Sequence, residues 1–215
     1  VEAVLRITFL TALPMGVGLS VLAQPTALLI YGARPGTVIV GRVLTTLGAA
    51  SVFAALCGPL NSILQAMGHV ELPVVLTLIG LFVKAVLDYT LAAVPSVNVL
   101  GGAVGTLVCY ALTSVLACIA IRRIAGVKID FFSTFKKPFL ASVCCGVAAL
   151  LTHKAWCAVL PESRFSALPA VFVGALIYVV FLMIARGICE EDIKALPNGE
   201  KITKRLEKYW QKAGG

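Results

Sequence analysis

Lys84 and Asp88 are the residues of this sequence best placed to do chemistry, because both lie inside a long apolar run from Leu72 to Val94. A charge in the hydrocarbon region of a membrane costs about 3 kcal/mol on insertion scales, so such residues are functional candidates by default. Their i,i+4 spacing places them on one face of a helix. Two interpretations follow: a local ion pair that neutralises itself and faces the bundle, or a polar patch on a transport pathway. In the second, Lys84 would attract an anionic headgroup and Asp88 would tune it.

Asn61 and Gln65 form a second i,i+4 pair within an apolar block. Amide side chains commonly hydrogen-bond between membrane helices, and this interpretation is favoured. The alternative is recognition of sugar hydroxyls, which makes both residues candidates for a transport pathway.

Two prolines and two glycines predict special helix geometry. Pro14 and Pro25 each remove a backbone donor, so both are candidates for helix kinks of the kind found in transporters. Gly101 and Gly105 form a G-x-x-x-G motif, which predicts close approach of a neighbouring helix.

The composition predicts an integral membrane protein, so its membrane helices must hold these residues in place. Of 215 residues, 60% are hydrophobic and 13% are charged, and the mean hydropathy is +0.99. A soluble chain has about 45–50% apolar and about 25% charged residues. These values exclude a disordered chain, a basic nucleic-acid-binding domain and an ordinary cytosolic enzyme.

The apolar blocks are long enough for an all-α, polytopic fold with six transmembrane helices. A crossing helix needs roughly 17–25 mostly apolar residues. Turn-like or charged segments separate the blocks. The predicted crossings are Ile7 to Tyr31, Thr37 to Met67, Leu72 to Val94, Val99 to Ala120, Phe139 to Val159 and Ala167 to Ala185.

The distribution of Lys and Arg predicts the orientation and explains the net charge of +8. With six crossings, both termini share one side with most of the basic residues, whereas the opposite side holds only Arg34, Arg42 and Arg164. Basic loops resist translocation. We therefore expect a multi-pass protein of the cytoplasmic membrane with both termini cytoplasmic and its basic residues near anionic lipid.

The C-terminal segment predicts a short amphipathic helix on the cytoplasmic membrane surface. Apolar and aromatic residues recur there at helical spacing, with basic residues on the other faces. The residues expected at the surface are Lys201, Lys204, Arg205, Lys208 and Trp210.

Motifs of enzymes and cofactor sites are missing from the sequence. It has no Walker A, G-x-S-x-G or H-E-x-x-H pattern, and none of its seven cysteines forms a C-x-x-C pair. We expect no catalysis, cofactor, metal site or nucleic-acid partner. The chain begins at Val1 without an initiator Met, which favours the C-terminal piece of a longer protein.

Three motifs resemble polysaccharide biosynthesis proteins of the stage V sporulation protein B type. These are relatives of lipid II flippases in the multidrug/oligosaccharidyl-lipid/polysaccharide exporter superfamily. The motifs are LNSILQAMG from Leu60 to Gly68, IGLFVKAVLDY from Ile79 to Tyr89 and LPNGEKI from Leu196 to Ile202. One departure is Asp88, where the family usually has Asn.

The resemblance implies the last six of fourteen helices, that is, the second lobe and two final helices. It divides the chain into residues 1–126, with four transmembrane helices of the C-terminal lobe, 127–187, with two final helices, and 188–215, a basic cytoplasmic tail. The implied function is to flip an undecaprenyl-linked oligosaccharide or peptidoglycan precursor by alternating access, for cell-wall or sporulation polysaccharide. The final two helices of this chain would hold a groove for the lipid tail. N-terminal helices of the same chain, outside this sequence, would complete the pathway.

Other functions stay open from the sequence. One is a drug/cation antiporter of the same superfamily, for which Asp88 is the only sign of an acidic coupling site. Another is a non-transporting six-helix membrane scaffold. A membrane-embedded enzyme would need its paired polar residues to face a common cavity.

Overall fold

The computed structural model describes residues 2–94, 98–126, 131–159 and 167–184. Within these ranges every regular element is an α-helix, and there are seven. They are α1 (Glu2–Val21), α2 (Ala23–Tyr31), α3 (Thr37–Ala66), α4 (Glu71–Ala92), α5 (Asn98–Ala125), α6 (Phe131–Val159) and α7 (Ala167–Ile184). The predicted membrane-surface tail, including Lys201, Lys204, Arg205, Lys208 and Trp210, lies outside the described residues.

The first predicted crossing is two helices rather than one. α1 ends at Val21 and the nine-residue α2 begins at Ala23. Pro25 lies in the first turn of α2, where a missing N–H is tolerated because it has no partner in its own helix. Pro14, in contrast, lies inside α1, which continues through it.

Four helices are long and apolar enough to cross a membrane. They cover Val4–Val21, Thr37–Ala66, Glu71–Ala92 and Val99–Ala125, and shorter apolar helical stretches lie at Phe139–Ala155 and Pro169–Tyr178. A polytopic, all-α membrane protein is therefore supported. The predicted count of six crossings stays a prediction, because the last two apolar stretches are shorter than a full crossing within the described residues.

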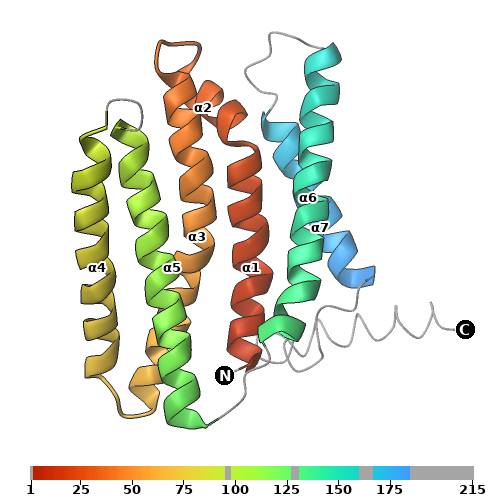
Figure 1. The fold of residues 1–215 in the computed structure, drawn as a ribbon. Helices are drawn as coiled ribbons and strands as arrows, with labels where there is room; N and C mark the ends of the chain where they lie inside the picture. The colour runs from red at the N-terminus through yellow and green to blue at the C-terminus, as the bar shows by residue number, and fades with distance from the viewer. Residues whose placement is uncertain (1, 95–97, 127–130, 160–166, 185–215) are drawn as a thin grey trace, which may run out of the picture.

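The helices form a row with a separate pair at one side. Figure 1 shows α4, α5, α3 and α1 standing side by side, with α6 and α7 on the other side of α1. α3 packs mainly on α5 and α1, and α4 packs mainly on α5. The α6–α7 pair contacts the rest of the described bundle through α1 and α2.

Small residues bring α1 and α3 together at Gly16 and Gly48. A Cβ placed on Gly16 would lie 2.8 Å from the carbonyl oxygen of Gly48. Such crowding leaves space for glycine alone, and it is the usual basis of tight packing between membrane helices. A leucine-rich core that includes Leu5, Leu60 and Leu64 fills the space nearer the N-terminal end of α1.

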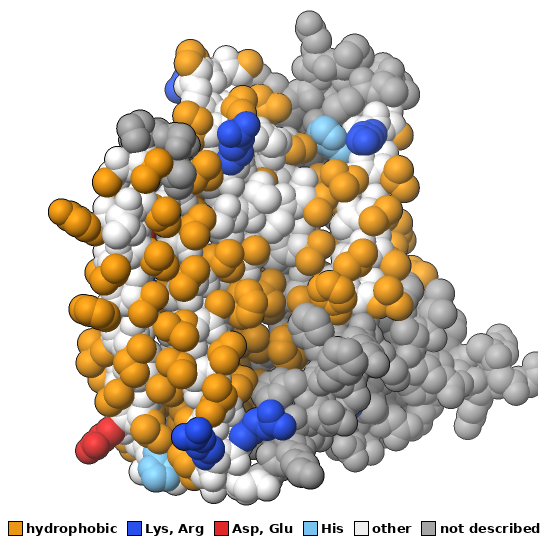
Figure 2. All heavy atoms as spheres, viewed as in Figure 1, with side chains coloured by type: hydrophobic (Ala, Val, Ile, Leu, Met, Phe, Trp, Pro, Cys, Tyr) orange, Lys and Arg blue, Asp and Glu red, His pale blue; other side chains and the backbone are white. Residues whose placement is uncertain are grey.

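The outer surface is apolar where a membrane would contact it. Figure 2 shows hydrophobic side chains across the middle of one face, with charged and His side chains gathered towards its two ends. Phe82 is 72% exposed and Tyr89 is 83% exposed, both on α4. Large exposed apolar patches are rare on soluble monomers and mark contact with lipid or protein.

Candidate functional site

A polar cavity of about 310 Å³ lies among α3, α4 and α5. Its lining combines Lys84 of α4 with Asn61 of α3, so it joins one residue from each predicted polar pair. Lys84 is the one charged side chain among the described residues that line it. The complete lining is Cys57, Asn61, Thr77, Leu81, Lys84, Thr106, Cys109, Tyr110 and Thr113.

The ion pair between Lys84 and Asp88 is formed. Lys84 Nζ lies 3.3 Å from Asp88 Oδ2, and the two side chains are 31% and 36% exposed. The other carboxylate oxygen, Asp88 Oδ1, is buried and has no hydrogen-bond partner among the described residues. Lys84 therefore neutralises Asp88 and also lines the cavity. The two interpretations made from the sequence, a neutralising ion pair and a polar patch on a transport pathway, can both hold for Lys84.

Glycines of α5 make room for Asp88. A Cβ on Gly105 would collide with Asp88 Oδ1 and lie 3.2 Å from Asp88 Cγ, and one on Gly101 would lie 2.7 Å from Leu91 Cβ. The close approach predicted from G-x-x-x-G is confirmed, and α4 is the partner helix. The carboxylate fits between the two helices because position 105 has no side chain.

The structure separates the members of the other predicted pair. Asn61 lines the polar cavity, and its Oδ1 is buried without a hydrogen-bond partner among the described residues. Gln65 is exposed and is not part of the lining. An amide oxygen without a partner beside a cavity can accept a hydrogen bond from a ligand hydroxyl or water.

The contribution of α5 to this cavity was not predicted from the sequence. Thr106, Tyr110 and Thr113 all line it and recur at i, i+4 and i+7, which is one helix face. This polar stripe inside an apolar block was the signal that could have found them. Thr113 Oγ1 donates a 2.8 Å hydrogen bond to the Cys109 carbonyl, which satisfies the hydroxyl proton within the helix.

A second cavity, of about 670 Å³, lies among α1, α2, α6 and α7. The predicted kink residue Pro14 lines it, whereas Pro25 does not. Its lining is almost entirely apolar or small: Leu10, Thr11, Pro14, Met15, Gly18, Leu19, Leu22, Thr26, Cys145, Ala149, Ala170, Val171, Gly174, Ala175 and Tyr178. None of these residues carries a charge, so the cavity suits a hydrocarbon chain.

Metal-ligand clusters are not found in the part of the chain that the structure describes. There, no group of three or more His, Cys, Asp or Glu side chains could hold a metal ion.

Two curated proteins of Bacillus subtilis (strain 168) are similar to this chain. Stage V sporulation protein B is 25% identical over 146 residues, which is 65% of this chain and 27% of that protein. The uncharacterized membrane protein YabM is 23% identical over 209 residues, which is 92% of this chain and 37% of that protein. The chain thus matches about a quarter to just over a third of the length of these relatives.

No protein-family model matches the chain, and no solved structure does. One relative bears the name of the protein type to which the motifs pointed, and the other is described as a membrane protein. The resemblance found in the sequence is supported as a distant similarity to this type of membrane protein.

Proposed function

We propose that this chain is part of a transporter that flips an undecaprenyl-linked oligosaccharide or peptidoglycan precursor across the cytoplasmic membrane by alternating access. The observation that carries the proposal is the presence of two cavities in one membrane bundle, one lined by Lys84 and several polar side chains and the other lined by no charged residue. A lipid-linked saccharide has a polar, anionic headgroup and a long apolar tail. Each cavity has the chemistry that one of these parts requires.

The polar cavity is suited to a headgroup. Lys84 is the basic group in the lining, and its ion-pair partner Asp88 lies outside the lining. An anionic headgroup would compete with Asp88 for the ammonium group. The diphosphate that links lipid and sugar is attracted to an ammonium group in a medium of low dielectric constant. Asn61, Thr106 and Tyr110 add groups that can hydrogen-bond to sugar hydroxyls.

The apolar cavity is suited to a lipid tail. It lies where the α6–α7 pair joins α1 and α2, and it has about twice the volume of the polar cavity, at about 670 Å³ against about 310 Å³. The tail of the substrate stays in hydrocarbon while the headgroup crosses, so a lateral apolar groove is needed beside the pathway. This position agrees with the groove that the family resemblance implies for the final two helices.

Topology and partners follow from the same proposal. Both termini would be cytoplasmic, in agreement with the distribution of Lys and Arg in the sequence. The chain would do no chemistry on its substrate and would need no cofactor. The other helices of the full-length protein would complete the headgroup pathway.

Filling the apolar cavity tests the proposal. Ala175 of α7 lines the cavity, and its neighbour Leu176 is 53% exposed and does not line it. Ala175→Phe in the full-length protein should abolish or strongly reduce complementation of a flippase-deficient strain, whereas Leu176→Phe should complement as well as wild type. Both variants must reach the membrane at wild-type levels. Full complementation by Ala175→Phe would contradict a tail-binding role for the cavity.

A further inference from the structure

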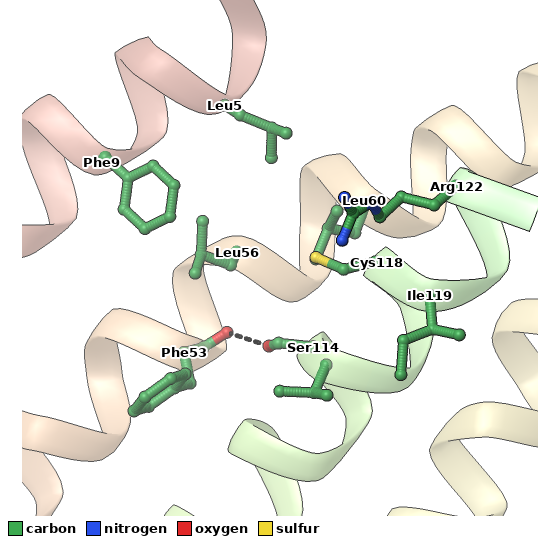
Figure 3. A pocket seen from close by; sticks show the side chains of 10 residues that line it. Leu5, Phe9, Phe53, Leu56, Leu60, Ser114, Cys118, Ile119 and Arg122 are labelled. Atoms are coloured by element: carbon green, nitrogen blue, oxygen red, sulfur yellow. Dashed lines mark hydrogen bonds between the residues drawn. The ribbon is translucent and has the colours of Figure 1, made fainter. Parts of the chain in front are cut away.

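A third cavity, of about 300 Å³, lies among α1, α3 and α5 and shares no lining residue with the other two. Figure 3 shows how Leu5 and Phe9 of α1, Leu56 and Leu60 of α3, and Cys118 and Ile119 of α5 surround it. Almost all of its walls are apolar. The complete lining is Leu5, Phe9, Phe53, Leu56, Leu60, Ser114, Val115, Cys118, Ile119 and Arg122.

The hydroxyl of Ser114, in the wall of this cavity, already has hydrogen-bond acceptors within the protein. Ser114 Oγ lies 3.1 Å from the Phe53 carbonyl oxygen and 2.7 Å from the Tyr110 carbonyl oxygen, and its hydrogen bond to Phe53 is drawn in Figure 3. A ligand with polar groups along its length would find no free partner at Ser114. The body of the cavity therefore favours a hydrocarbon chain.

Arg122 places one positive charge at the end of this apolar cavity. It lies in the last turn of α5, and within the described residues it has no salt-bridge partner. In Figure 3 its side chain extends from α5 towards Leu60 of α3. Arg122 lies eight positions after Ser114, which corresponds to ~12 Å along the helix axis, so the cavity runs from the charged helix end into the apolar span.

We propose that this cavity holds one acyl chain of an anionic phospholipid of the surrounding membrane, with the lipid phosphate bound by Arg122. A guanidinium group can form two parallel hydrogen bonds to a phosphate. An apolar helix or side chain from another protein would fill the cavity but would leave the Arg122 guanidinium without an anion. Charge complementarity therefore selects the lipid.

Access from the membrane supports the same occupant. Val115 and Ile119 form part of the wall and are 52% and 42% exposed, so the cavity is open on the α5 side. A lipid can enter there without crossing water. This lipid would be structural or regulatory and distinct from the transported substrate, because the three cavities have separate linings.

Native mass spectrometry of the full-length protein tests the proposal, with phosphatidylglycerol and phosphatidylcholine of identical acyl chains as probes. Wild-type protein should retain phosphatidylglycerol in preference to phosphatidylcholine. Arg122→Gln should weaken retention of phosphatidylglycerol about tenfold, the effect of losing one charge-assisted contact. Arg123→Gln is the matched control, because Arg123 lies in the same last turn but does not line the cavity.

Ile119→Trp separates a specific cavity from general attraction to the basic surface. This substitution keeps Arg122 and fills the cavity from its exposed rim, so it should also lower retention of phosphatidylglycerol. Equal losses in Arg122→Gln and Arg123→Gln, or unchanged retention in Ile119→Trp, would overturn the proposal. Equal retention of the two lipids by wild-type protein would do the same. Each variant must keep the wild-type melting temperature in lipid-free detergent.

Discussion

The hydroxyl of Tyr178 on α7 donates a hydrogen bond to the backbone carbonyl of Leu10 on α1. In an uninterrupted helix this carbonyl would accept from the N–H of residue 14, four positions later. Residue 14 is a proline and has no N–H. A carbonyl released by Pro14 is thus satisfied by a side chain from another helix, as membrane interiors require.

We predict that Tyr178→Phe destabilises the full-length protein by about 1 kcal/mol, because the Leu10 carbonyl is left buried without its donor. Unfolding in mixed micelles at increasing SDS concentration measures this change. Tyr178 is only 8% exposed, and the phenylalanine ring fills the same space, so lost packing contributes little.

A double-mutant cycle with Pro14→Ala isolates the hydrogen bond. Alanine restores the N–H at position 14, which can then bond to the Leu10 carbonyl within α1. In this background, removal of the Tyr178 hydroxyl should cost at most half as much. An equal cost in both backgrounds would show that the carbonyl freed by Pro14 is not what Tyr178 stabilises.

Gly105→Ala should weaken the packing of α4 on α5. The added methyl group meets the Asp88 carboxylate, so the helices must separate or the ion pair with Lys84 must move. Overpacking of this kind costs about 1–3 kcal/mol, which the same unfolding measurement would detect. Gly102→Ala is the control, because a Cβ there meets nothing within 4 Å. A similar loss of stability in both variants would show that contact with α4 is not the cause, because the change from glycine to alanine by itself favours a helix.

Lys84→Ala should impair translocation, whereas Asp88→Asn should not. Lys84 lines the polar cavity and Asp88 does not, so only the first substitution removes a charge from the lining. Asparagine is also the residue that the resemblance described from the sequence motifs implies at position 88. The measurement is complementation of a flippase-deficient strain by the full-length variants, with membrane levels checked. If both variants complement fully, the ion pair is structural and the cavity is not a pathway for an anionic headgroup.

Helix bounds were predictable where the sequence separates apolar blocks with turn residues. The predicted start of α3 at Thr37 is correct, and its predicted end differs by one residue, because glycines flank both sides of this block. Of the two predicted kink residues, Pro25 lies three residues after the break at Leu22 between α1 and α2, whereas α1 continues through Pro14. Whether a proline interrupts its helix depends on tertiary partners, and the partner of the Leu10 carbonyl is 168 residues away in the chain.

The candidate site was predictable residue by residue but not as an arrangement. Lys84 and Asn61 attract attention because polar groups are costly in an apolar span. Their shared cavity depends on how α3 and α4 both pack on α5, and the spacing within one helix carries no information about that. The same limit explains why Gln65, four residues from Asn61, is not part of the lining.

The large apolar cavity gives α1 one stiff side and one compliant side. Towards α3, backbone lies against backbone at Gly16 and Gly48, so any relative displacement meets steep repulsion. Towards α7, the unfilled volume offers little resistance over several residues. A mechanical load on the bundle would therefore deform the contact between α1 and α7 first, because α6 packs closely on α1 where Gly146 meets Val17.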